Sequence, residues 1–410
     1  MAAATVSSSS SAISVHLTRA LFVSGCAVEG EVQLNFRHIH EENIQSVHIK
    51  LRGSAYTSIT RDRTTLTEVI SLVRENQSIW SRGSGVYAAP GSDILRIPFR
   101  LQLPPDLPPS FHYNMFPVEA SIKYSLTAVG VRQGLFHLNR NVRMPLAVVP
   151  KDSVGIRELE KLPTSASGHA HDYVHMRTLW KEDKIRRGLW GDYATVRVEW
   201  SIADLAVYPL FVPIPFEIRV KTVSPPISRA KAVAYPPDKA VFPPVPTSFS
   251  MVQLKLKRKL HVRAQMYRDE STCDVAVRTA DKPINMELPE KEWVLGEGAG
   301  QSEKAKSPDA KGTWVQWVTF TGSFRLDCPP TFELEAIKCE YTLDLKVPFP
   351  GIGNDVRIRL PIVVTSGINE PVHRDGANVP RPMSSRDHLQ LDLPPAYWDV
   401  NNGRWGDEKE

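Results

Sequence analysis

The stretch LDLPPAYWDV, residues 391–400, carries the most specific chemistry in this chain. Pro394, Pro395 and Tyr397 form a PPxY motif, in which the two prolines preset an extended polyproline II conformation. The aromatic grooves of WW domains accept such proline rings, and the tyrosine adds apolar area with a polar tip. A leucine precedes the prolines, and a valine three residues after the tyrosine would return to the same partner through one helical turn. The motif therefore predicts a WW-domain ligand made by Leu393, Pro394, Pro395, Tyr397 and Val400.

A second candidate is the segment MVQLKLKRKLHVRAQMY, residues 251–267, where basic and apolar residues alternate. On a strand, leucines and valines would face inward and one basic face would point outward. Such a face could attract acidic lipid headgroups or acidic or phosphorylated peptides. The alternative is a solvated strand whose lysines discourage edge pairing. The residues proposed for this face are Lys255, Lys257, Lys259 and Arg263, with His261 between them.

Residue types that could hold a metal or perform catalysis occur without a complete pattern. His169, His171 and His175 lie close together, but no cysteine or second ligand cluster accompanies them. The glycines of GEGAG lack the Lys-Ser/Thr that follows a phosphate-binding loop. The sequence contains neither a GxSxG nor an HExxH motif. We therefore expect no catalytic residue, no metal and no cofactor.

Composition is typical of a globular chain, with 42% hydrophobic and 23% charged residues. A net charge of +5, from 50 basic and 45 acidic residues, is too small to indicate nucleic acid. No apolar run approaches the roughly 20 residues that cross a bilayer, and the first residues do not resemble a secretory signal. Cys26, Cys273, Cys328 and Cys339 form no CxxC pair, so we expect reduced cytosolic thiols.

The elements that must position these residues are predicted to be strands, because apolar residues recur at every second position. This alternation is clearest over 337–347 and 212–220, and it recurs over 95–103. One apolar and one polar face are typical of antiparallel sheets, so we predict an all-β fold of sandwiches. The only helix expected is a short one over 153–162.

The sequence also contains an internal repeat. FRLQLPPDLPPSF (99–111) resembles FRLDCPPTF (324–332), and each is followed by an Ile-Lys strand with Tyr-x-Leu and then by a valine-rich strand with one proline. Matching features in the same order indicate two copies of one β-domain. The organisation predicted is an N-terminal sandwich, a linker, a C-terminal sandwich with mobile insertions at 224–248 and 296–312, and a disordered tail, over residues 13–151, 152–191, 192–367 and 368–410.

These features resemble the arrestin family, specifically the fungal α-arrestins, over about residues 15–367. The resemblance rests on the order of three stretches: VEGEVQLNFRHIHEENIQSVHIKLRGSAYT, then LPPSF with IKYSLTAVGVR, and then FTGSFRLDCPPTF with YTLDLKV and LPIVVTSGI. It implies two immunoglobulin-like sandwiches joined by a hinge, and it implies no enzymatic activity.

The resemblance further implies an adaptor that recruits a HECT-type ubiquitin ligase, through WW domains, to a plasma-membrane transporter or receptor. Cargo ubiquitylation and endocytosis would follow, and a lysine of the chain would itself receive ubiquitin. Such a protein would be cytoplasmic and recruited peripherally to the plasma membrane or endosomes. Many relatives carry several PPxY motifs and this chain carries one, so avidity within one chain is excluded. The alternative is a structural sorting or coat subunit similar to the arrestin-like subunit of retromer.

Overall fold

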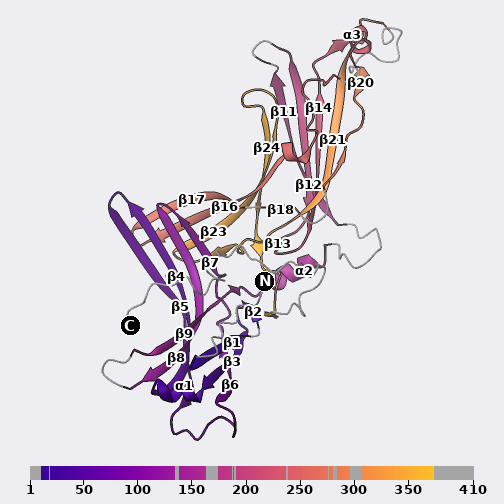
Figure 1. The fold of residues 1–410 in the computed structure, drawn as a ribbon. Helices are drawn as coiled ribbons and strands as arrows, with labels where there is room; N and C mark the ends of the chain where they lie inside the picture. Colours follow the sequence, from indigo (N-terminus) through magenta and orange to yellow (C-terminus); the bar gives the residue numbers. More distant parts are fainter. Residues whose placement is uncertain are drawn as a thin grey trace.

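The computed structural model of the chain describes residues 11–17, 19–133, 138–162, 174–186, 188, 191–236, 239–275, 277–279, 284–295 and 307–373. This part of the chain is mostly strand, arranged in antiparallel sheets, and the predicted all-β sandwich fold is confirmed. Figure 1 shows two groups of sheets, one formed before helix α2 (Ser153–Leu159) and one after it.

The first group contains two main sheets whose apolar faces share one core. One sheet has the order β1-β3-β6, with β1 (Ile13–Leu17), β3 (Ala27–Asn35) and β6 (Ile94–Gln102). Helix α1 (Phe36–Glu41) follows β3. The other has the order β5-β4-β8-β7 and carries β9 on β8, with β4 (Ile44–Arg61), β5 (Thr64–Ser81), β7 (Phe111–Met115), β8 (Val118–Arg132) and β9 (Arg140–Leu146).

The second group has the same two-sheet plan. One sheet has the order β11-β12-β14-β21-β15, with β11 (Met176–Arg186), β12 (Tyr193–Ala203), β14 (Ile214–Val223), β21 (Lys311–Arg325) and β15 (Ile227–Ser228). Three short strands also pair with β21: β18 (Arg278–Thr279), β19 (Asn285–Glu287) and β20 (Glu292–Leu295). The facing sheet has the order β17-β16-β23-β22 with β24 on β23, formed by β17 (Tyr267–Val275), β16 (Gln253–Ala264), β23 (Ile337–Pro348), β22 (Phe332–Glu333) and β24 (Asp355–Ile362).

The alternation of the sequence becomes burial in these strands. Along β12, Val196, Val198 and Trp200 are fully buried, whereas the residues between them are half-buried. Because successive side chains point to opposite faces, each such strand contributes one row to a core. The short helix predicted over 153–162 is confirmed over 153–159 only, and α2 begins after the Asp152 N-cap, whose Oδ1 accepts a hydrogen bond from the Gly155 amide at 2.7 Å.

The predicted repeat is confirmed at the level of single hydrogen bonds. Tyr124 donates from its hydroxyl to the Pro108 carbonyl at 2.8 Å, and Tyr341 donates to the Pro329 carbonyl at the same distance. Pro108 is the first proline of the second Pro-Pro pair in the first copy, and Pro329 is the first proline of the single pair in the second copy. The two tyrosines therefore fix equivalent turns in the two sandwiches.

The residues after each Pro-Pro pair match as well. Ser110 Oγ accepts from the Val148 amide at 3.0 Å, and Thr331 Oγ1 accepts from the Val364 amide at 2.9 Å. Both acceptor side chains thereby hold the start of a short parallel strand. These strands are β10 (Val148–Val149), which pairs with β2 (Arg19–Val23), and β25 (Val364–Thr365), which pairs with β13 (Tyr208–Pro209).

The repeated tyrosines give a matched test. Tyr124→Phe and Tyr341→Phe are each expected to lower the free energy of unfolding by about 1–2 kcal/mol, because a buried proline carbonyl loses its donor. Burial raises the pKa of Tyr341 well above its usual value, so its hydroxyl stays protonated. Denaturant titration would measure both variants. Tyr87→Phe, at a ring that is 54% exposed, is the control, and a loss confined to one repeat would contradict equivalence.

Two predicted boundaries are wrong. The linker over 152–191 is predicted to lack strands, but β11 pairs with β12 along its whole length. The tail is predicted to begin at 368, but residues 366–373 return to the first sandwich. Asp152 Oδ2 accepts from the Gly367 amide at 2.8 Å, and β26 (Val372–His373) pairs with β2. Backbone pairing of this short segment, which its composition does not reveal, accounts for the difference.

The predicted insertions are only partly within the described residues. The proline-rich stretch 224–248 contains β15 and helix α3 (Arg229–Val233). The short 3₁₀ helix η1 (Phe249–Met251) follows it directly. Ser228 caps α3 by accepting from the Lys231 amide. Residues 296–306 of the second insertion lie outside the described residues.

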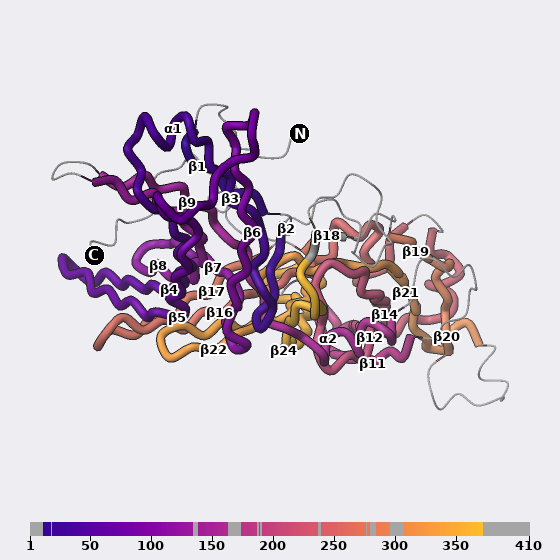
Figure 2. Tube along the Cα trace, turned by 90° about the horizontal axis from the view of Figure 1, so that it is seen from below, coloured from indigo at the N-terminus to yellow at the C-terminus, as the bar shows by residue number. Residues whose placement is uncertain are grey.

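The two sandwiches meet where the hairpin β16–β17 lies beside β4, β5 and β7, as Figures 1 and 2 both show. At the centre of this junction, the rings of Phe111 and Phe332 stack edge to face, with 5.2 Å between centroids. These phenylalanines occupy equivalent positions of the repeat, directly after Ser110 and Thr331. The two copies of the repeat therefore contact each other through the phenylalanine at the equivalent position of each copy.

Candidate functional site

The predicted WW-binding residues lie outside the described residues. Leu393, Pro394, Pro395, Tyr397 and Val400 all follow His373, the last residue that the structure describes. Of the three clustered histidines, His169 and His171 also lie outside it. His175 is described, and its Nδ1 lies 3.3 Å from Asp204 Oδ2 with its side chain 86% exposed. Among the described residues, no group of three or more potential metal ligands is found.

The predicted basic strand is confirmed as a strand with the expected parity, but its charge is neutralised. Lys255 pairs with Asp274 at 2.6 Å, Lys257 with Asp344 at 3.0 Å and Lys259 with Glu270 at 2.9 Å. Arg263 contacts Glu68 at 2.9 Å and Glu335 at 2.8 Å. The acidic partners come mainly from β17 and β23, which flank β16.

This pairing leaves fewer free cations on the predicted basic face for acidic partners or lipid. Asp344 is buried and also lies 3.7 Å from Arg359 on β24, so its carboxylate is already surrounded by cations. Arg263 is committed to the junction, because Glu68 belongs to the other sandwich. The structure therefore assigns the polar face of β16 to cross-strand ion pairs and to contact between the sandwiches.

One charged residue of the same strand points inward. Arg258 is buried on the apolar face of β16, with its guanidinium carbon 5.4 Å from the ring centroid of Phe111 and 5.5 Å from that of Tyr113. Both rings belong to β7 of the first sandwich, so the cation is held by aromatic faces across the junction. Arg258 shares the parity of Leu256 and Leu260, so the alternation of the sequence places it on the buried face. Its charge alone would not predict that position.

Two of the cysteines near Arg258, Cys328 and Cys339, do not have the character of nucleophiles. All four cysteines are free thiols, as predicted. Burial raises the pKa of Cys339 to about 12 and also raises that of Cys328. Because the thiolate is the reactive form, both thiols remain protonated and unreactive at neutral pH.

The most exposed apolar side chains near the junction lie on hairpin tips. Phe116, in the turn between β7 and β8, is 86% exposed, and Met266, in the turn between β16 and β17, is 79% exposed. Met115 beside Phe116 is 57% exposed. We call Met115, Phe116 and Met266, with the β4–β5 turn between them, the tip surface.

Hydrogen bonds hold the three tips together. The Thr60 amide donates to the Pro117 carbonyl at 3.0 Å, which joins β4 to the Phe116 turn. Arg61 donates to the Arg268 carbonyl, and its guanidinium lies over the Tyr267 ring at 5.0 Å. Gln265 donates to the Thr67 carbonyl at 2.9 Å, which joins the Met266 turn to β5. Both sandwiches thus contribute to one surface, seen at one end of the strands in Figure 2.

The tip surface combines exposed apolar side chains on turns with arginines beside them. Exposed apolar side chains on turns bordered by arginines combine desolvation with charged contacts at the rim, as protein interfaces do. The sequence could have indicated this surface, because Phe116-Pro117 and Gln265-Met266 stand between strands where polar turn residues are usual.

Comparisons with known proteins give no family for this chain. No protein-family model matches it, and no curated protein matches it. In the described residues, no helix is long and apolar enough to span a membrane. The resemblance to arrestins therefore stays a prediction from sequence motifs.

Proposed function

We propose that the chain is a non-enzymatic, arrestin-like adaptor that binds a membrane-protein cargo and recruits a WW-domain HECT ubiquitin ligase. The observation that carries the proposal is the Pro394-Pro395-Ala396-Tyr397 motif, which has the residues a WW groove requires. Cargo ubiquitylation and endocytosis follow from bringing ligase and cargo together. The protein would act in the cytoplasm, at the plasma membrane or endosomes.

The position of the motif supports separate sites for the ligase and the cargo. Its first proline is residue 394, and the last strand ends at His373, so the intervening chain can span at most about 70 Å. A ligase held within that distance raises the local concentration of its active site around the sandwiches and their cargo. We assign the cargo contact to the tip surface, because Phe116 and Met266 expose apolar area there.

Affinity purification of the full chain from cells tests the proposal. The wild-type chain should retain a HECT ligase, and Tyr397→Ala should lose it while keeping the membrane cargo. Phe116→Ser combined with Met266→Ser should do the reverse, whereas Ile352→Ser, at another fully exposed apolar residue, should change neither.

The same experiment separates the adaptor from a sorting or coat subunit. A coat subunit would bring stoichiometric partner subunits in every variant, including Tyr397→Ala, and would retain no HECT ligase. That outcome would contradict the adaptor proposal and favour the alternative.

A further inference from the structure

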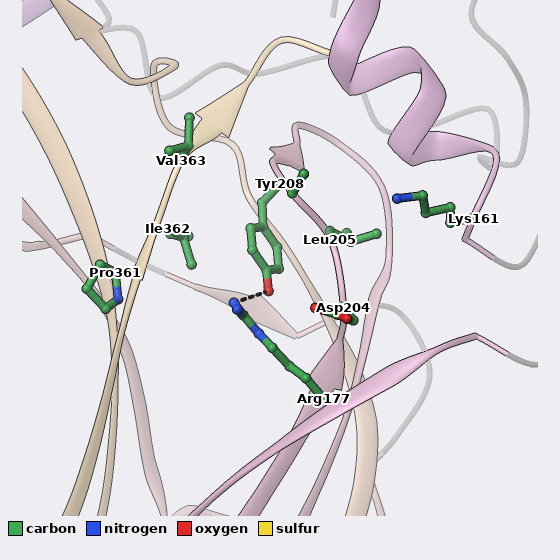
Figure 3. Close-up of a pocket in the computed structure, with 9 residues that line it drawn as sticks. Lys161, Arg177, Asp204, Leu205, Tyr208, Pro361, Ile362 and Val363 are labelled. Atoms are coloured by element: carbon green, nitrogen blue, oxygen red, sulfur yellow. Dashed lines mark hydrogen bonds between the residues drawn. The ribbon is translucent and has the colours of Figure 1, made fainter.

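A pocket of about 450 Å³ lies where the end of α2 meets the second sandwich, away from the tip surface. Figure 3 shows side chains converging on it from several elements: Lys161 after α2, Arg177 at the start of β11, Asp204 and Leu205 after β12, and Tyr208 on β13. Its volume falls in the range of small-molecule sites.

Arg177 is the side chain that gives this pocket a chemistry. Its Nη2 donates to the Tyr208 hydroxyl at 3.1 Å, drawn as the dashed line in Figure 3, and that hydroxyl in turn donates to the Ala203 carbonyl at 3.1 Å. The Nε atom of Arg177 is enclosed, yet no described group accepts its hydrogen bond. Among the described residues, Arg177 also has no ion pair with a carboxylate.

Lys161, the other cation in the lining, is already paired. Lys161 Nζ contacts both carboxylate oxygens of Glu158, at 2.7 and 2.9 Å. The Oε2 atom of the buried Glu158 also accepts from the Ala206 amide at 3.1 Å. Asp204 pairs with His175. Arg177 is therefore a cation in the pocket lining without a carboxylate partner among the described residues, whereas the guanidinium of Arg258 lies over the rings of Phe111 and Tyr113.

We propose that this pocket binds a small carboxylate with an aliphatic body, its carboxylate held by Arg177. A guanidinium presents a planar fork of donors that matches the two oxygens of a carboxylate. In Figure 3, Ile362 and Val363 lie on one side of the Tyr208 ring and Leu205 on the other, and these apolar side chains would cover the aliphatic body. Asp204 in the same lining repels a doubly charged phosphate more strongly than a singly charged carboxylate, because the repulsion between like charges grows with the charge of the ligand.

The test uses the full chain labelled with ¹⁵N in its arginines, and three probes that share a six-carbon body: hexanoate, hexanamide and hexyl phosphate. Hexanoate is expected to shift one Nε–H signal in a saturable manner, and hexanamide is expected to leave it unmoved. The signal is assigned to Arg177 by its absence from Arg177→Gln. A calorimetric titration should show hexanoate affinity at least about tenfold weaker in that variant, since a charge-assisted hydrogen bond is lost.

Two variants keep the result interpretable. Arg177→Lys retains the charge but removes the fork, so it should also weaken hexanoate binding if the fork is what recognises the carboxylate. Arg219→Gln, at an exposed arginine of β14, should bind hexanoate like the wild type. The melting temperature of each variant shows that it is folded. An unmoved Arg177 signal, or tighter binding of hexyl phosphate than of hexanoate, would overturn the proposal.

Discussion

Replacing Phe111 with alanine is expected to lower the free energy of unfolding by about 3–5 kcal/mol, the usual cost of removing a fully buried phenylalanine. The ring is completely buried, stacks on Phe332 of the other sandwich and lies under the guanidinium of Arg258. Its loss leaves a cavity at the junction and a buried cation with one aromatic face fewer. Denaturant titration, followed by fluorescence and circular dichroism, measures the change.

Phe116 supplies a matched control five residues further along the chain. Because this side chain is 86% exposed, Phe116→Ala is expected to change the free energy of unfolding by less than about 0.5 kcal/mol. Phe332→Ala should resemble Phe111→Ala, and the double variant should cost less than the sum, since the rings share one contact. If Phe111→Ala were as mild as Phe116→Ala, the junction would not be packed as described.

Tyr397→Ala is expected to slow ubiquitin transfer to the chain by at least about tenfold in a reconstituted reaction with a HECT ligase. The reason is that docking of the motif converts an encounter in solution into a reaction at high effective concentration. The rate is measured as the appearance of the ubiquitylated chain, at ligase concentrations below saturation.

Trp398→Ala is the control for this reaction, because it removes the neighbouring aromatic side chain and leaves PPxY intact. It should react at close to the wild-type rate. Equal rates for wild type and Tyr397→Ala, at ligase concentrations far below saturation, would show that the motif does not recruit the enzyme.

Period-two alternation predicted the strands that bury one face, because every second residue of such a strand is apolar. Ile337, Cys339 and Tyr341 alternate with polar residues, and β23 buries all three. The repeat could also be predicted from the sequence, because the Pro-Pro turns and the tyrosines that donate hydrogen bonds to their carbonyls recur in the same order. Both features depend on neighbours within one strand or one turn.

Edge strands were harder to predict. β11, within the expected linker, forms the edge of its sheet and exposes or half-exposes nearly every residue, including Trp180 at 59%. A strand that pairs along one edge and has no continuous buried row shows no apolar–polar alternation in its sequence. Only the pairing with β12 therefore identifies β11 as a strand. β5 is also an edge strand, although its burial alternates.

The basic strand shows the limit of reasoning from one segment. Its parity was predictable, but Lys257 is paired with Asp344, which lies far along the chain on β23. The tip surface and the Arg177 pocket likewise bring together residues that only the packing of several elements makes neighbours. Local sequence contains no record of those contacts.

The most direct test of the adaptor proposal is a titration of a labelled peptide of residues 385–410 into the WW domains of a HECT ubiquitin ligase, beside its Tyr397→Ala version. The proposal predicts saturable binding of the wild-type peptide that the substitution removes. Absence of binding by either peptide, or equal binding by both, would contradict it.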